Sequence, residues 1–196
     1  VICVLDPHDR NPHHVIWAYL DRDDDMFVDY ELITHCELDE LARRIIQTEK
    51  ARGYRMRRRI IDPNFGRKPA SSGNNRSVMD ELHRFGASFG EGDDNVELGH
   101  MVVRDFLHFD LTRPVKAVNK PKLFFSRERT PITIRSMRNH QYQDWQGKTK
   151  EDRDPKEQQK DKDTHGADCI RYLSISRPTY GRMTERVQDE MAQAPY

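Results

Sequence analysis

The sequence predicts an α/β domain built on a mixed β-sheet, because β-type segments alternate with helix-type segments along most of its 196 residues. Three β-type segments follow one another over residues 1–33 with connections too short for a helix, which predicts an antiparallel meander. A helical pattern from residue 38 then separates this meander from a fourth strand at 59–61. A right-handed crossover of this kind would lay the fourth strand parallel to the first, so both kinds of pairing are expected in one sheet.

The three strands of the meander differ in their expected burial. Residues 1–5 form a continuous apolar run that ends at Asp6, which is typical of a buried strand with a polar exit. Residues 14–20 form the second strand, and apolar and acidic residues alternate over 26–33, as in a half-exposed third strand. The acidic stretch 21–25 fits the turn between the second and third strands.

A helix and a fourth strand follow the meander. Apolar residues recur at helical spacing from residue 38, and Gly53 is expected to end this helix. Residues 59–61 predict a strand that ends, like the first, in Asp-Pro, here at Asp62. A loop of small and polar residues is expected over 64–76. The helical stripe consists of Leu38, Leu41, Ala42, Ile45 and Ile46.

The second half of the chain continues the alternation. Ser77 and Asp80 form a capping-box pattern, which predicts a short helix that ends near Gly86. After it we expect a strand near 87–89 and then a helix with an apolar stripe formed by Leu98, Met101, Val102, Phe106 and Phe109. A strand at 121–125, a helix over 131–145 and a final apolar segment at 167–174 are expected to follow.

These elements predict one domain over residues 1–176, followed by a tail over 177–196. Residues 147–163 contain no large apolar side chain, so this stretch is expected to be a mobile charged loop within the domain. The chain begins with Val1 inside a predicted strand rather than with a methionine, which predicts one domain of a longer protein.

The charges balance overall but not locally. Lys plus Arg and Asp plus Glu both number 33, so a generally polybasic nucleic-acid coat is excluded. Residues 1–50 carry 12 acidic and 5 basic residues, whereas 51–76 carry 8 basic residues and 1 acidic residue. An acidic surface beside a basic strip suits metal ions next to a phosphate backbone, although solvated surface charge produces such blocks as well. No apolar run reaches the roughly 18 residues of a membrane span, and three cysteines without a C-x-x-C pair predict a reduced, intracellular protein.

Three acidic residues are candidates for a single site. If the first and fourth strands are parallel neighbours, Asp6 and Asp62 lie at the same edge of the sheet, although each alone is a common turn former. Asp168 and His165 are three residues apart and share a face if this segment is helical. Carboxylates grouped without cysteines select hard cations such as Mg²⁺ or Mn²⁺.

Other polar residues near these acids have weaker signals. Arg67, Lys68 and Arg76 follow Asp62 in sequence, and Lys148 and Lys150 precede Asp168. All five are candidates for contacts with a phosphate backbone, with solvated charge as the alternative. His8, His13 and His14 follow Asp6, but no second cluster closes a zinc site, so they are expected to be loop residues.

Three segments together resemble the nuclease domain of tailed-phage large terminases, which has the ribonuclease H-like fold. They are Val4-Leu5-Asp6-Pro7, Ile60-Ile61-Asp62-Pro63-Asn64-Phe65-Gly66 and His165-Gly166-Ala167-Asp168-Cys169-Ile170-Arg171-Tyr172. The resemblance covers residues 1–176, and its most specific part is the last segment, where the family has a His and an Asp followed by an Arg-Tyr pair. The family often has alanine at the position of Cys169, which is similar in size.

The resemblance implies that Asp6, Asp62 and Asp168 are catalytic ligands of two Mg²⁺ or Mn²⁺ ions, with His165 as a further ligand or as a neighbour that supports one. It implies a metal-dependent endonuclease that cuts double-stranded DNA concatemers during viral genome packaging, with little sequence specificity, by two-metal-ion hydrolysis. The implied partners are double-stranded DNA, an upstream ATPase domain, a portal protein and a small terminase subunit, in the host cytoplasm and without a membrane. A Holliday-junction resolvase or recombinase of the same fold, and a non-catalytic DNA-clamping or docking module, are the alternatives.

Overall fold

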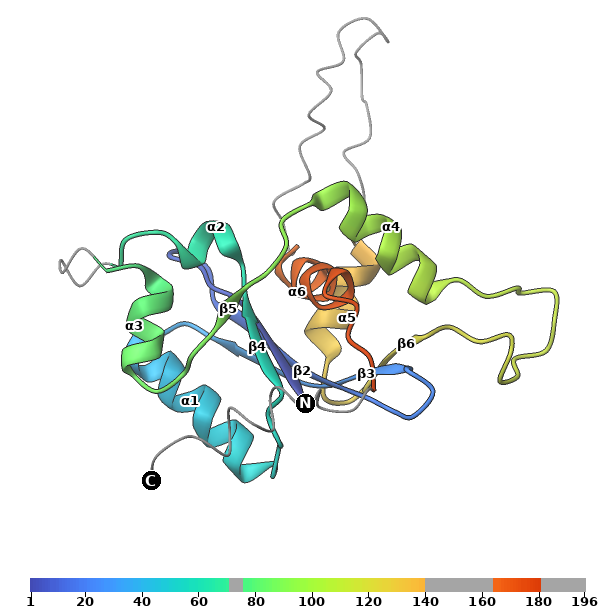
Figure 1. The fold of residues 1–196 in the computed structure, drawn as a ribbon, viewed down its shortest axis with the longest axis horizontal. Coiled ribbons are helices and arrows are strands. Elements are labelled where there is room, and N and C mark those ends of the chain that lie inside the picture. Colours follow the sequence, from blue (N-terminus) through green and yellow to red (C-terminus); the bar gives the residue numbers. More distant parts are fainter. Residues whose placement is uncertain (71–75, 140–163, 181–196) are drawn as a thin grey trace, which may run out of the picture.

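A computed structural model describes residues 1–70, 76–139 and 164–180 of the chain. Their strands form one six-stranded sheet in the order β5-β4-β1-β2-β3-β6 (Figure 1). The strands are β1 (Ile2–Asp6), β2 (His13–Leu20), β3 (Met26–Thr34), β4 (Arg58–Ile61), β5 (Gly90–Glu91) and β6 (Leu123–Phe125). The helices are α1 (Leu38–Ala51), α2 (Pro63–Gly66), α3 (Val78–Arg84), α4 (Val96–Leu107), α5 (Pro131–Asn139) and α6 (His165–Ile175).

The sheet is mixed, as the sequence predicts. The strands β1, β2 and β3 form the antiparallel meander, with Asp6 opposite His14 and His13 opposite Thr34. The strand β4 returns parallel to β1, with Leu5 opposite Ile61. The outer strands β5 and β6 also pair in parallel, with β4 and β3 respectively. The expected ribonuclease H-like arrangement of a meander followed by parallel strands is therefore present.

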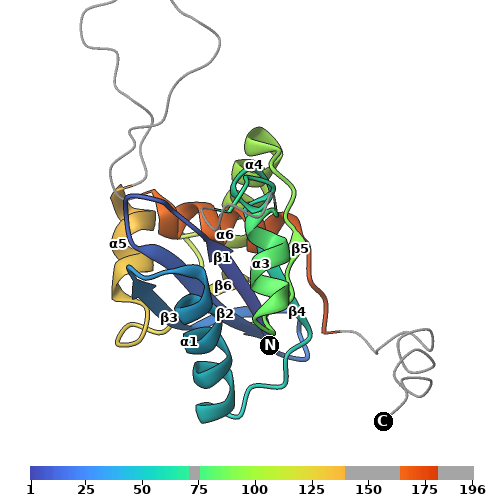
Figure 2. The ribbon, with the colours of Figure 1, turned by 90° about the vertical axis from the view of Figure 1, so that its left-hand side faces the viewer.

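Helices cover both faces of this sheet. Figure 1 shows α1 and α3 on one side and α4, α5 and α6 on the other, and Figure 2 shows α1 and α3 in front of the strands. Side chains of β1 alternate between the two resulting cores, because Cys3 and Leu5 pack toward α1 while Ile2 and Val4 pack toward α6. All four are buried, which explains why the first strand reads as continuously apolar. The edge of the sheet where β1 and β4 end is thereby held in a fixed position.

Two short elements differ from what the sequence predicts. Residues 63–66 form the helix α2 inside the predicted loop, because Pro63 occupies its first position and the Asp62 carboxylate caps it by accepting a 2.9 Å hydrogen bond from Asn64 N. The strand expected at 87–89 lies instead at Gly90–Glu91, where Ile60 and Ile61 provide a parallel partner. Local patterning gives little signal for elements of this length.

The expected apolar stripe of α4 is partly wrong. Val102 is buried, but Met101 is 51% exposed, and the helix ends at Leu107, before Phe109. The capping box of α3, in contrast, is confirmed, since Ser77 and Asp80 exchange both of its hydrogen bonds. Gly53 and Gly86, which end α1 and follow α3, both have positive φ angles, where glycine carries no steric penalty.

Several expectations lie outside the described residues. They are the remainder of the predicted 131–145 helix beyond Asn139, the charged loop at 147–163 with Lys148 and Lys150, and the tail beyond Tyr180. Thr179 and Tyr180, at the end of the described part, contact Arg57 and Asp24 through backbone atoms. Within the described ranges, every helix is too short or too polar to cross a membrane.

Candidate metal centre

Asp6 and Asp62 lie side by side at one edge of the sheet, as the parallel crossover predicts. Asp6 is the last residue of β1, and Asp62 follows directly after β4. The Asp62 backbone N–H donates a 3.1 Å hydrogen bond to the carbonyl of Leu5, so the parallel pairing extends to the two acids. Their spacing is thus fixed by backbone hydrogen bonds rather than by flexible loops.

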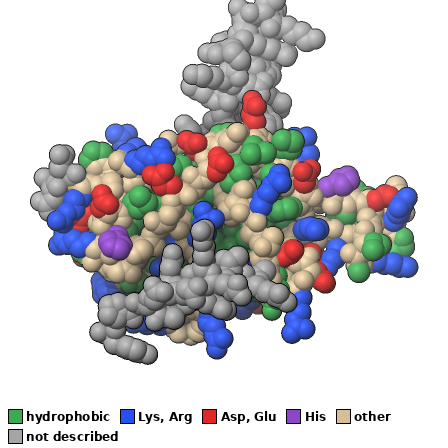
Figure 3. Space-filling view, in the orientation of Figure 1, with side chains coloured by type: hydrophobic (Ala, Val, Ile, Leu, Met, Phe, Trp, Pro, Cys, Tyr) green, Lys and Arg blue, Asp and Glu red, His purple; other side chains and the backbone are tan. Residues whose placement is uncertain are grey.

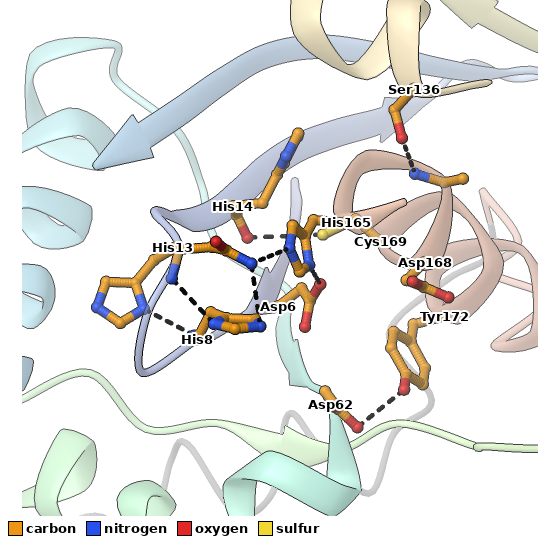
Figure 4. A network of polar contacts seen from close by, with 12 residues as sticks. Asp6, His8, His13, His14, Asp62, Ser136, His165, Asp168, Cys169 and Tyr172 are labelled. Atoms are coloured by element: carbon orange, nitrogen blue, oxygen red, sulfur yellow. Dashed lines mark hydrogen bonds and ion pairs between the residues drawn. The ribbon is translucent and has the colours of Figure 1, made fainter. Parts of the chain in front are cut away.

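The helix α6 brings the third acid to the same edge. Ile170 and Leu173 are fully buried against the sheet, which fixes α6 across β1. His165 and Asp168 occupy the first turn of this helix, and His165 Nδ1 donates a 2.7 Å hydrogen bond to Asp6 Oδ2. Figure 4 shows Asp6, Asp62 and Asp168 around one region, at the ends of β1 and β4 and at the start of α6. The structure therefore brings the three predicted acids together.

The three acids repel one another, and the effect is largest at Asp6. Asp6 is 7% exposed, and its pKa is raised from 3.8 to about 6, chiefly by burial, with the negative charges of Asp168 and Asp62 acting in the same direction. The hydrogen bond and charge of His165 act in the opposite direction. A divalent cation would relieve the same repulsion, so the electrostatics favour a bound metal.

Each of the three carboxylates has one oxygen held by a side chain of α6. His165 holds Asp6 Oδ2 at 2.7 Å, and the Tyr172 hydroxyl donates to Asp62 Oδ1 at 2.8 Å. Arg171 donates to Asp168 Oδ1 from Nε and Nη2, both at 3.3 Å. The other oxygen of each carboxylate has no hydrogen-bond partner among residues 1–70, 76–139 and 164–180. Three such oxygens form a hard donor set that fits Mg²⁺ or Mn²⁺.

His165 is engaged on both sides of its ring. Its Nδ1 contacts Asp6, its Nε2 lies 3.4 Å from Asn11 Nδ2, and its ring meets the His8 ring edge-on at 4.9 Å between centroids. These contacts fit a residue that orients Asp6. Direct coordination of a metal by His165 stays a prediction.

Two of the histidines expected in a loop are buried in β2, so that expectation was wrong. His13 Nδ1 accepts a hydrogen bond from the backbone of His8, and its Nε2 donates to the carbonyl of Cys36 at 2.8 Å. His14 Nε2 lies 2.9 Å from Thr133 Oγ1, and burial lowers the pKa of His14 to about 3. Both rings satisfy buried polar groups and are neutral at pH 7 in this environment.

A tighter acidic group lies elsewhere. Among the described residues, Asp21, Asp23 and Asp25 form the one set of three potential ligands whose ligand atoms all lie within 4.8 Å of one another. This set occupies the turn between β2 and β3, at the edge of the sheet opposite Asp6. Lys120 is ion-paired with Asp25, and that hydrogen bond, followed by the charges of the three acids, raises the pKa of Lys120. Lys120 therefore already supplies a cation to this turn.

The predicted DNA-contacting residues within the described part surround α2. Arg67 is ion-paired with Glu91, Arg76 lies 3.5 Å from Glu81, and Lys68 lies over the Phe65 ring with its side chain 54% exposed. Over the face drawn in Figure 3, Lys and Arg side chains are interspersed with Asp and Glu rather than gathered into one basic patch. The ion pair of Lys68, 4.0 Å to Asp9, is the longest of the three, so Lys68 has the weakest acidic partner among these cations.

Comparison with known proteins connects this site to a known fold. No protein-family model and no curated protein sequence matches the chain. Among solved structures, the Mn-bound nuclease domain of the g2p large terminase from bacteriophage SPP1 superposes with a TM-score of 0.52 at 20% identity, covering 88% of this chain and 83% of that domain. The P22 large terminase nuclease domain gives 0.52 at 15% identity, covering 95% and 85%. The chain has the fold of a large-terminase nuclease domain.

A large terminase structure is similar to this chain over part of its length. The structure from the thermophilic bacteriophage D6E gives a TM-score of 0.62 at 13% identity, and the match covers 89% of this chain but 39% of the D6E protein. The ribonuclease H-like fold implied by the sequence resemblance is thus confirmed. The sequence had singled out Asp6, Asp62, Asp168 and His165, but it had not assigned a role to Tyr172, although its spacing of four from Asp168 places both on one helical face.

Proposed function

We propose that this chain is a divalent-metal-dependent endonuclease that hydrolyses phosphodiester bonds of double-stranded DNA. The observation that carries the proposal is the meeting of Asp6, Asp62 and Asp168 at one sheet edge of a terminase nuclease fold. Two Mg²⁺ or Mn²⁺ ions held there would neutralise the phosphate and stabilise the leaving oxygen. The Mn bound to the nuclease domain from phage SPP1 supports this choice of metal.

The residues of the chain have separate tasks in this proposal. The charges of both Asp62 and Asp168 act on Asp6, so Asp6 is the ligand that both ions would share. Asp62 and Asp168 would each serve one ion. His165 holds Asp6 through its 2.7 Å hydrogen bond and keeps the opposite oxygen turned toward the centre. No serine, cysteine or lysine nucleophile is required, because water is the attacking group.

Basic side chains beside the centre would bind the DNA backbone. Lys68, Arg67 and Arg76 follow Asp62 and are about half exposed or more. Lys148 and Lys150, which lie outside the described residues, are proposed as further contacts with DNA phosphates. Contacts limited to phosphates would give affinity with little sequence preference.

The biological role proposed is cleavage of concatemeric DNA during packaging of a viral genome in the host cytoplasm. The names of the matched structures support it, since all are large terminases or their nuclease domains. In this role an ATPase domain elsewhere in the full protein, a portal protein and a small terminase subunit would be partners. The match covers 39% of the D6E terminase, which is consistent with further domains in the full protein.

Plasmid DNA should be cleaved only when Mg²⁺ or Mn²⁺ is present, and faster with Mn²⁺, which tolerates less regular coordination. The measurement is conversion of supercoiled to nicked and linear plasmid with each metal, with excess EDTA as the control. Full activity in EDTA would contradict the proposal. Binding without cleavage at any metal concentration would favour a DNA-clamping module, and preferential cutting of four-way junctions by a dimer would favour a resolvase.

Lys68→Ala should weaken DNA binding about equally for unrelated sequences and lower the slope of log Kd against log salt by about 1. Fluorescence anisotropy with two short duplexes in Ca²⁺ measures both quantities. Lys50→Ala is the matched control, because Lys50 is exposed at the far end of α1. An unchanged salt slope for Lys68→Ala would remove this residue from the DNA surface.

A further inference from the structure

The side chain of Tyr172 connects α6 to the end of β4. Its hydroxyl donates a 2.8 Å hydrogen bond to Asp62 Oδ1, and the backbone N–H of Asn64 donates to the same oxygen at 2.9 Å. Two donors on one oxygen fix the rotation of the carboxylate. The second oxygen, Oδ2, has no hydrogen-bond partner among the described residues.

The aromatic ring that carries this hydroxyl is itself fixed. Tyr172 is 3% exposed, and the guanidinium of Arg171 lies over its ring at 4.2 Å from the centroid. A Cβ atom at position 92 would lie only 2.8 Å from Tyr172 Cδ1, so the backbone after β5 approaches the ring as closely as glycine alone allows. Gly92 N also donates a 2.9 Å hydrogen bond to the carbonyl of Ile61, the residue directly before Asp62.

These contacts connect one another. The Tyr172 hydroxyl is bonded to Asp62, the preceding residue Ile61 is bonded to Gly92, and Gly92 lies against the Tyr172 ring. Buried tyrosine hydroxyls usually find a hydrogen-bond partner, and the partner of Tyr172 is a carboxylate that lies beside two other acids. Partners that orient ligating groups are recurrent parts of metal centres, because they fix the direction of the ligand's free lone pairs.

We propose that Tyr172 is a positioning residue of the metal centre, holding Asp62 so that its free oxygen faces the ion that Asp62 would bind. The inference rests on the proposed function and adds a residue that touches neither substrate nor metal. It assigns to the tyrosine hydroxyl, rather than to its ring, the effect on metal affinity.

The test compares Tyr172→Phe with Tyr54→Phe in the 196-residue chain. Tyr54 also donates its hydroxyl to an aspartate, Asp29, but on the opposite side of the sheet, where it packs near Trp17. Each variant loses one tyrosine–carboxylate hydrogen bond, so the two should lose similar stability. Isothermal titration of Mn²⁺ into the metal-depleted chain, without DNA, should show weaker binding by about 10- to 100-fold for Tyr172→Phe alone.

The metal dependence of cleavage provides a second readout. The Mn²⁺ concentration for half-maximal plasmid cleavage should rise by the same factor for Tyr172→Phe, and the rate should recover at saturating Mn²⁺. Gly92→Ala, which would push the ring away while keeping the hydroxyl, should shift Mn²⁺ binding in the same direction. Thermal melts establish that each variant is folded at the assay temperature.

The outcomes separate this inference from the proposed function. Mn²⁺ affinity equal to wild type in folded Tyr172→Phe, or an equal loss in Tyr54→Phe, overturns the positioning role while leaving the nuclease proposal intact. A wild-type chain that neither binds Mn²⁺ nor cleaves DNA overturns the nuclease proposal itself. If Tyr172→Phe does not fold, unchanged Mn²⁺ binding by folded Gly92→Ala overturns the positioning role instead.

Discussion

Asp6→Asn is expected to lower Mn²⁺-dependent cleavage of plasmid DNA by more than about 100-fold, since even groups that only support metal ligands account for 10- to 100-fold. The substitution keeps the size of the side chain, and the amide oxygen can still accept the hydrogen bond from His165. It removes the negative charge of Asp6, the carboxylate on which the charges of Asp62 and Asp168 both act. The loss should therefore be chemical rather than structural.

The same substitution at Asp62 or Asp168 should have a comparable effect. Initial rates of nicking at saturating Mn²⁺ measure it, and Asp105→Asn, at an exposed position of α4, is the matched control. A near-wild-type rate for any one of the three variants would remove that acid from the metal centre. Loss of activity in Asp105→Asn as well would indicate that the assay reports general damage.

In the absence of metal, Asp6→Asn should stabilise the chain above pH 6. Burial, together with Asp168 and Asp62, raises the pKa of Asp6 from 3.8 to about 6, so between these values the folded state binds a proton that the unfolded state does not. The contribution of Asp6 to stability therefore falls as the pH rises through this window, at about 1.4 kcal/mol per unit. The asparagine variant does not ionise at this position. Its free energy of unfolding should therefore exceed that of wild type by up to about 3 kcal/mol above pH 6 and should equal it below about pH 4.

Urea denaturation at intervals from pH 4 to pH 8, with EDTA present, measures this difference. Excess Mn²⁺ should reverse the order at neutral pH, because a ligand that binds only the folded state stabilises wild type. If the free energy of unfolding changes with pH in the same way for the two proteins, the pKa of Asp6 is not raised by its environment. A gain that persists at pH 4 would point to a packing effect of the amide instead.

Much of the candidate centre follows from the sequence, for a physical reason. Apolar runs that end in Asp-Pro mark where buried strands leave the sheet, and a single helical crossover makes β1 and β4 parallel, so Asp6 and Asp62 had to share an edge. Helical spacing placed His165 and Asp168 on one face of α6. These arguments depend on local periodicity and chain handedness, which the order of residues alone determines.

Tertiary contacts decided the remainder. Tyr172 reaches Asp62 across 110 positions of sequence, His13 and His14 proved to be buried partners of Cys36 and Thr133, and β5 exists because β4 offers it a parallel edge. None of these has a local signature, because each depends on which segments meet after the sheet has assembled. The order of residues thus determined which acids share an edge, whereas packing of α6 across that edge decided which oxygen of each acid is hydrogen-bonded by a side chain of that helix.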